Sequence, residues 1–245
     1  SKQDGHHRGG IAGLAQAARL WPDKAALVCE PGGTVVRFGE LEAQAHRAAR
    51  ALRTAGLRPG DCVVLCLSNG PAFVAAMLGA HRAGLYYTLV SPKASPGDLH
   101  YIACDALARL VLAEPPRRWR RGGRAPSAPG SGSWDRALAA EPDTPLPDLV
   151  AGMEMMYSSG STGRPKGIRR PPICQRWDDP DPRNVDIQRS SGVSGDSVYL
   201  STSPLYHSAP HRYLMAFLHA GATTVLMAHF DAALALQAID RHGCT

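Results

Sequence analysis

The stretch Tyr157-Ser158-Ser159-Gly160-Ser161-Thr162-Gly163-Arg164-Pro165-Lys166-Gly167 follows a short apolar run, Met153 to Met156, that is interrupted only by Glu154. An apolar run that leads into glycines and small hydroxylated residues is typical of a buried strand ending in a turn. The hydroxyl groups can bind an anion, and the glycines let several backbone N–H groups turn toward one point. Lys166 adds a compact positive charge. The stretch therefore predicts a loop that binds a polyanion.

A solvent-exposed turn is the alternative interpretation for a segment rich in glycine and serine. The combination of hydroxyls, glycines and one lysine directly after an apolar strand favours the anion-binding loop. The segment is not a Walker A loop, because the spacing from Gly160 to Lys166 differs and Gly167 stands where a Ser or Thr would hold the metal. An ordinary P-loop NTPase is therefore disfavoured.

The residues before this loop alternate between strand and helix patterns. The continuous apolar run at 62–67 is typical of a strand that is covered on both faces. The pattern predicts strands at 25–29, 34–38, 62–67, 85–90 and 110–113, and helices at 11–19, 41–52, 71–83 and 95–106. This alternation predicts the α/β class, with a mostly parallel sheet and flanking helices.

The regular pattern stops between residues 114 and 147, which are rich in proline, glycine, serine and arginine. We expect a long loop there, separating an N-terminal α/β segment (1–113) from a second α/β segment (148–245) of the same large domain. Five arginines flank Trp119 in this loop, and such a cluster is one footprint of nucleic-acid binding. A solvated loop is favoured because no binding module surrounds the cluster, so we expect no nucleic-acid partner.

The segment after the anion-binding loop begins irregularly, at 171–196, and then becomes regular again. Asp178, Asp179 and Asp181 favour a turn over a cation site, since the glycine and glutamate of a calcium loop are absent. Strands are predicted at 198–201 and 222–227, and helices at 211–220 and 231–242. His207 ends a strand-like segment, at the edge where open α/β sheets bind ligands. A structural histidine is the alternative, and Pro210 disfavours a metal pair with His211.

Composition places the chain among globular proteins of one large domain. It has 245 residues, 44% hydrophobic and 20% charged, with a formal net charge of +6 from 27 Lys and Arg against 21 Asp and Glu. The six cysteines form no CxxC pair or zinc-type cluster, which indicates a reduced, cytoplasmic protein. No apolar run reaches the roughly 18 to 20 residues of a membrane span, so we expect no transmembrane segment.

Several pieces of the sequence together resemble one enzyme family. The string YSSGSTGRPKG (157–167) resembles the phosphate-binding loop of the adenylate-forming superfamily, which includes acyl-CoA synthetases, peptide-synthetase adenylation domains and luciferases. Three further pieces resemble acyl-CoA synthetases: residues 34–84, SPLYHSAP (203–210) and residues 221–245. Together with the loop, they occur along the chain in the order expected of that family. The resemblance thus covers most of the chain and is weakest at 115–147 and 171–196.

The resemblance implies an AMP-forming acid–thiol ligase. Such an enzyme lets a carboxylate attack the α-phosphorus of ATP, giving an acyl-adenylate and pyrophosphate, and then transfers the acyl group to the thiol of CoA. We expect ATP, CoA and a carboxylic acid, in particular a fatty acid, as substrates, with Mg²⁺ bridging the phosphate oxygens. His207 is similar to the aromatic residue beside the acyl pocket. The residues expected to hold the β- and γ-phosphates are Ser158, Ser159, Gly160, Ser161, Thr162, Gly163 and Lys166.

Other motifs of that family have no counterpart in these 245 residues, among them the ribose-binding aspartate and the catalytic lysine of the mobile C-terminal domain. We therefore expect the incomplete N-terminal half of the large domain, with no catalytic residue of its own and no acyl-CoA synthesis by this chain alone. Such a half should expose apolar surface and self-associate, as a homodimer or as aggregates. A fragment of an amino-acid adenylation domain and a non-catalytic nucleotide-binding remnant are the alternatives.

Overall fold

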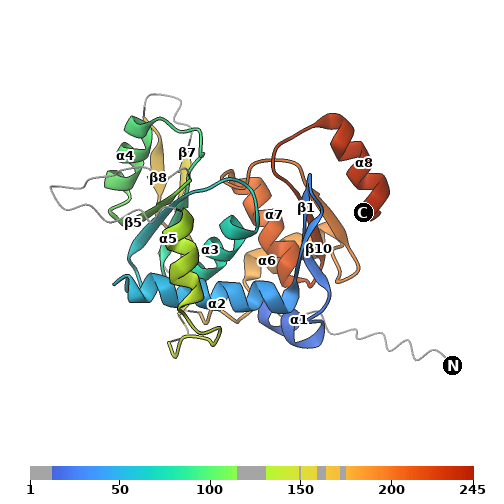
Figure 1. Ribbon diagram of the computed structural model, residues 1–245, viewed down its shortest axis with the longest axis horizontal. Helices are drawn as coiled ribbons and strands as arrows, with labels where there is room; N and C mark the ends of the chain where they lie inside the picture. Colours follow the sequence, from blue (N-terminus) through green and yellow to red (C-terminus); the bar gives the residue numbers. More distant parts are fainter. Residues whose placement is uncertain (1–12, 115–130, 149, 159–163, 172–174) are drawn as a thin grey trace.

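The computed structural model describes residues 13–114, 131–148, 150–158, 164–171 and 175–245 (Figure 1). In this part of the chain the strands form two four-stranded sheets and one two-stranded hairpin, surrounded by helices. The fold is α/β with mostly parallel strands, which confirms the predicted class.

The first sheet joins the two ends of the described chain. Its strand order is β2 (Thr34–Arg37), β1 (Ala25–Glu30), β10 (Thr223–Met227) and β9 (Val198–Ser201). β1 and β2, the strands predicted at 25–29 and 34–38, form an antiparallel hairpin, whereas β1, β10 and β9 run parallel. The N-terminal hairpin is therefore held in place by a strand nearly two hundred residues later in the sequence.

The second sheet is parallel throughout. Its order is β5 (Ala108–Ala113), β3 (Cys62–Cys66), β4 (Tyr86–Leu89) and β6 (Met153–Glu154). Every residue of β3 is buried, as expected for a central strand with both faces covered. The edge strand β6 leads into β7 (Met156–Ser158), which pairs antiparallel with β8 (Lys166–Ile168). The predicted anion-binding loop is thus the connection of a short hairpin at one edge of this sheet.

One continuous hydrophobic core connects the two sheets. Helix α3 packs on the second sheet and α7 on the first, and both contribute to the same buried cluster, which includes Phe73, Met77, Leu214 and Leu218. In Figure 1, α2 runs along one side of the molecule beside α1, α3 and α5. The helices in these layers are α1 (Leu14–Leu20), α2 (Phe38–Thr54), α3 (Pro71–Arg82), α4 (Pro96–Asp105), α7 (Ser208–His219) and α8 (Ala232–His242).

Two further helices lie in regions that were predicted to be irregular, so that prediction was wrong there. Helix α5 (Ser131–Ala139) lies inside the stretch 114–147 that was expected to be a loop, and α6 (Pro182–Ser191) lies inside 171–196. Trp134 of α5 is buried in the main core, next to α2. Its burial supplies a tertiary stabilisation that helix propensity alone did not reveal. The arginine cluster around Trp119 lies outside the described residues.

The aspartates at 178, 179 and 181 shape a turn and a helix start. Asp178 forms an ion pair with Arg176 (2.9 Å), and Asp179 accepts a hydrogen bond from the backbone N–H of Arg176. Asp181 is the N-cap of α6 and accepts from the backbone N–H of Arg183. Within the described residues, no group of three or more His, Cys, Asp and Glu side chains is arranged to hold a metal ion. Nor does this part of the chain contain a helix with the length and apolarity needed to cross a membrane.

Candidate active site

A cavity of about 800 Å³ lies between the β7–β8 hairpin, the end of β4, α4 and the start of α7. Its lining is largely apolar and includes Leu89, Val90, Ile102, Met156 and Ile168. Ser158, from the predicted anion-binding loop, and His207, from the LYHSAP segment, both line it. The fold therefore brings together in one cavity two candidate residues that lie about fifty positions apart in the sequence.

Ser158 and Lys166 are directly opposite each other in the hairpin, and the Ser158 hydroxyl donates to the carbonyl of Lys166 (3.4 Å). Because opposite residues of an antiparallel pair project from the same face, both side chains lie on the face that Met156 and Ile168 present to the cavity. Lys166 is exposed and is not itself a lining residue. The other predicted phosphate-binding residues, Ser159, Gly160, Ser161, Thr162 and Gly163, lie outside the described residues.

The position after Lys166 has little room for a side chain, and it is occupied by Gly167. A Cβ atom at this position would lie 2.8 Å from the ring of Tyr157 and 2.5 Å from Met155. Such contacts are too short, so a side chain here would displace the methyl end of Met155 and the ring of Tyr157, which donates to Asp105. The glycine thus leaves room for the Tyr157 ring beside the hairpin.

Helix α4 contacts the hairpin at both ends of its connecting loop. The Tyr101 hydroxyl donates to the carbonyl of Pro165 (3.0 Å), and the guanidinium of Arg164 lies 5.0 Å from the Tyr101 ring centroid. Tyr157 donates to the carboxylate of Asp105 (2.6 Å). Burial and this hydrogen bond raise the pKa of the Tyr157 phenol, so it remains a neutral donor. Both ends of the loop are therefore fixed to one helix.

His207 is exposed to the cavity at the N-cap position of α7. Its ring lies beside that of Tyr206, with centroids 4.5 Å apart. The preceding segment is held by Asn69, whose side-chain oxygen accepts from the backbone N–H of Leu205 (2.9 Å) and whose amide nitrogen donates to the carbonyl of Met227 (3.0 Å). These contacts tie the segment before His207 to the end of β10 and to the turn before α3.

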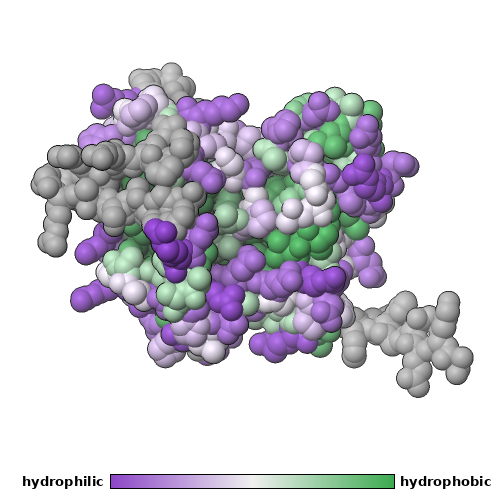
Figure 2. All heavy atoms as spheres, viewed as in Figure 1, coloured by the Kyte–Doolittle hydropathy of each residue, from purple (hydrophilic) through white to green (hydrophobic). Residues whose placement is uncertain are grey.

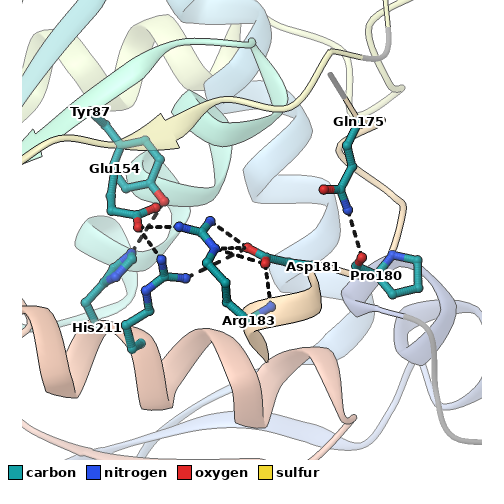
Figure 3. Close-up of polar contacts among 8 residues, drawn as sticks. Tyr87, Glu154, Gln175, Pro180, Asp181, Arg183 and His211 are labelled. Carbon is teal, nitrogen blue, oxygen red and sulfur yellow. Dashed lines mark hydrogen bonds and ion pairs between the residues drawn. The ribbon is translucent and has the colours of Figure 1, made fainter. Parts of the chain in front are cut away.

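A charged network that the sequence analysis missed lies beside this cavity. Glu154 is 7% exposed and its Oε1 atom pairs with the guanidinium groups of Arg183 (2.8 Å) and Arg212. Asp181 also pairs with Arg183 (2.7 Å), as Figure 3 shows. The network ties β6, just before the hairpin, to α6 and α7. The only signal in the sequence was Glu154 itself, a charge inside an otherwise apolar run.

Buried neutral groups complete the surroundings of the network. The Tyr87 hydroxyl lies 3.4 Å from Nε2 of His211, and both side chains are almost fully buried. Burial lowers the pKa of His211 to about 4, so the imidazole is neutral at pH 7. For Asp181 the effects oppose each other. Burial alone would raise the pKa of its carboxyl group, but the hydrogen bonds and the charge of Arg183 hold this pKa below its usual value. His211 is thus buried beside Tyr87, whereas His207 faces the cavity.

Known proteins of similar sequence are ligases. The 4-coumarate–CoA ligase 5 of Oryza sativa subsp. japonica is 30% identical over 242 residues, covering 91% of this chain and 44% of that protein. A feruloyl-CoA synthase of an Amycolatopsis species is 28% identical over 236 residues, covering 93% and 46%. The chain thus spans less than half the length of these two relatives.

A solved structure with a similar fold and a model of one enzyme family also match this chain. The o-succinylbenzoate coenzyme A synthetase of Bacillus subtilis in complex with AMP matches with a TM-score of 0.74 at 24% identity, covering 95% of this chain and 59% of that one. At this identity the match establishes the fold, which is that of the N-terminal domain of adenylate-forming enzymes. The model for the AMP-binding enzymes matches residues 14–245. The chain belongs to the AMP-binding enzyme family, whose members include adenylate-forming CoA ligases.

Proposed function

We propose that this chain supplies the triphosphate-binding and acid-binding part of an AMP-forming acyl-CoA synthetase. In the proposed reaction a carboxylate oxygen attacks the α-phosphorus of ATP and pyrophosphate leaves; the thiol of CoA then displaces AMP from the acyl-adenylate. The observation that carries the proposal is that Ser158 and His207 line one cavity. A cavity with a polyphosphate loop on one wall and an apolar pocket beside it can hold the two reactants of the first step together.

The chain's own residues would bind and orient rather than transfer protons. Ser158 and Lys166 would contact the β- and γ-phosphates, together with the loop residues between them, and Mg²⁺ bound with the triphosphate would supply further positive charge. His207, exposed at the start of α7, would lie beside the reacting carboxylate. These contacts would neutralise charge on the phosphates and hold the α-phosphorus in line for attack.

For the acid we propose an aromatic carboxylic acid in preference to the fatty acid expected from the sequence. The relatives include ligases named for 4-coumarate, ferulate and 3-hydroxybenzoate, which are aromatic acids. The cavity lining supports a compact apolar substrate, since Val90, Ile102, Tyr157 and Tyr206 all face it. A fatty acid is the second candidate, because the same apolar walls also suit an aliphatic chain.

Binding of ATP to the 245-residue chain tests the phosphate-binding role. Isothermal titration with Mg²⁺ present should detect binding, and Lys166→Ala should weaken it by about 10-fold or more, since a charge-assisted hydrogen bond contributes about 1.5–3 kcal/mol. Arg136→Ala is the control, because this exposed arginine lies on α5, which contributes no lining residue to the cavity. Equal affinities for the wild type and Lys166→Ala would contradict the assignment.

We also propose that the chain self-associates and that it is located in the cytoplasm. Phe230, Leu236 and Ile239, on and next to α8, are 65%, 70% and 44% exposed. Figure 2 shows hydrophobic surface over this helix. An exposed apolar face of this kind supports a homodimer in solution. The use of ATP and CoA supports a location in the cytoplasm.

A further inference from the structure

A second, much smaller cavity lies beside the charged network, between β6, α3, α6 and α7. Gln175, Asp181 and Arg183, which Figure 3 labels, belong to its lining. The cavity gives the centre of a water molecule about 20 Å³ of space. A buried water needs about 10–15 Å³ measured in this way, so the cavity has room for one water molecule.

Three side chains that line this small cavity carry a buried polar atom without a hydrogen-bond partner among the described residues. These atoms are Nδ1 of His81, Nδ1 of His219 and Oδ1 of Asn184. Asn184 and His219 are 2% and 7% exposed, so bulk solvent does not satisfy their polar atoms. Buried polar atoms in native proteins nearly always have a partner, which is often an ordered water. Three unpaired atoms around one cavity therefore indicate one shared partner.

The charges around the small cavity favour a neutral partner. Its charged lining residues are two arginines and two aspartates, with a formal charge of zero: Arg176, Asp179, Asp181 and Arg183. Burial lowers the pKa of His81 and of His219 to about 4, and the positive charge of Arg82 adds to this effect. Both imidazoles are therefore neutral at pH 7. The cavity thus has no net charge with which to attract an anion or a cation.

The hydrogen-bonding capacities of the three atoms match those of one water molecule. Oδ1 of Asn184 only accepts. The His81 ring has a hydrogen bond to the backbone of Gly152 that raises the pKa of the ring, so the ring is the donor in this bond. Because Nδ1 is the unpaired atom, Nε2 carries the donated proton and Nδ1 accepts. Two acceptors use both protons of a water, so Nδ1 of His219 has to donate to it.

We propose that the small cavity is a binding site for one water molecule, which donates to Oδ1 of Asn184 and Nδ1 of His81 and accepts from Nδ1 of His219. The site joins α3, α6 and α7, and it does not depend on the proposed function. It also fixes opposite tautomers, with His81 protonated on Nε2 and His219 on Nδ1. A metal ion in the same place would need a lone pair on both Nδ1 atoms, so both rings would then be protonated on Nε2.

NMR of the histidine rings in the 245-residue chain at pH 7 tests the tautomers, because protonated and unprotonated ring nitrogens have well-separated ¹⁵N shifts. Spectra of His81→Gln and His219→Gln assign the two rings. We expect opposite tautomers in the wild type. A crystal structure that shows ordered water should also contain one water in the cavity, about 2.7–3.2 Å from each of the three atoms.

A variant then tests the role of Asn184. Asn184→Leu replaces the acceptor by an apolar side chain of similar size, and its crystal structure should lack the water. Asp186→Leu, an exposed position on the same helix, is the matched control and should retain it.

Each outcome decides the inference, and the wild-type measurements do not depend on whether a variant folds. Two rings protonated on Nε2 would assign the cavity to a metal ion, and two rings protonated on Nδ1 would leave His81 without an acceptor; either result overturns the proposal. A wild-type crystal structure with no water peak in the cavity overturns it as well. So does a water that remains in Asn184→Leu, because the amide oxygen would then not be one of its partners.

Discussion

Glu154 interrupts the apolar run before the hairpin because two arginines meet it in the folded protein. The carboxylate is 7% exposed and contacts the guanidinium groups of Arg183 and Arg212, which come from α6 and α7. A charge in this position is tolerated only because it is paired. One side chain of β6 therefore links the strand that leads to Ser158 with α7, the helix that His207 caps.

Replacing Glu154 by Ala should destabilise the protein by about 3 kcal/mol or more, because Arg212 would lose its close carboxylate partner while remaining largely buried. Urea unfolding followed by circular dichroism measures the change. Asp143→Ala is the control: Asp143 also pairs with an arginine, Arg47 at 3.1 Å, but its side chain is 53% exposed. That variant should stay within about 1 kcal/mol of the wild type. Equal losses in the two variants would show that burial of the ion pair is not what matters.

Helices α2 and α3 cross closely at Gly79, which has no side chain to keep them apart. A Cβ atom at Gly79 would lie 2.4 Å from the Cβ of Ala48 and 2.9 Å from its backbone carbon. Gly79→Ala should therefore cost about 1–3 kcal/mol of stability, since α2 would have to move. Gly97→Ala, in the first turn of α4, meets nothing closer than 3.7 Å. It should instead stabilise by about 0.4–1 kcal/mol. Thermal unfolding of both variants checks the opposite signs.

The elements that the sequence predicted well are those whose signals are local. The apolar run at 62–67 became the buried strand β3, and Ser95 caps α4 by accepting from the backbone N–H of Asp98 (3.0 Å). Asp231 caps α8 in the same way. Helix α5 was missed because its stability depends on burying Trp134 against α2, a contact that is distant in sequence. The cap of α6, Asp181-Pro182, was a local signal that was interpreted only as a turn.

At the scale of the whole molecule, two sheets formed by interleaved parts of the chain create the site. Pairing of β1 with β10 closes the first sheet, and pairing of β4 with β6 places the hairpin on the second. The sequence indicated Ser158 and His207 as separate candidates, but their meeting in one cavity depends on this long-range pairing. The Glu154 network depends on it too, so neither the shared cavity nor the network was predictable from local patterns.

Acid should unfold the molecule through three histidines in its core. His211 and His219 are 1% and 7% exposed, His81 is half-buried with an enclosed Nδ1 atom, and burial lowers the pKa of each to about 4. In the unfolded chain a histidine has a pKa of about 6.5. Below that pH the unfolded state takes up protons that the folded state does not, so stability falls as the pH drops from about 6.5 toward 4. The loss between pH 7 and pH 5 should be about 2 kcal/mol for each histidine.

Urea titrations at pH 7, 6 and 5 measure this loss, and one substitution assigns it. His219→Gln should reduce the difference between pH 7 and pH 5 by about 2 kcal/mol, since glutamine does not titrate. His229→Gln is the control, because that side chain is exposed and is not buried by folding. Carboxylates do not account for a change in this range: the ion pairs hold the pKa of Asp181 below its usual value, so its contribution is lost only below about pH 4. An unfolding free energy that is flat from pH 7 to pH 5 would mean that the three imidazoles reach solvent in the folded protein.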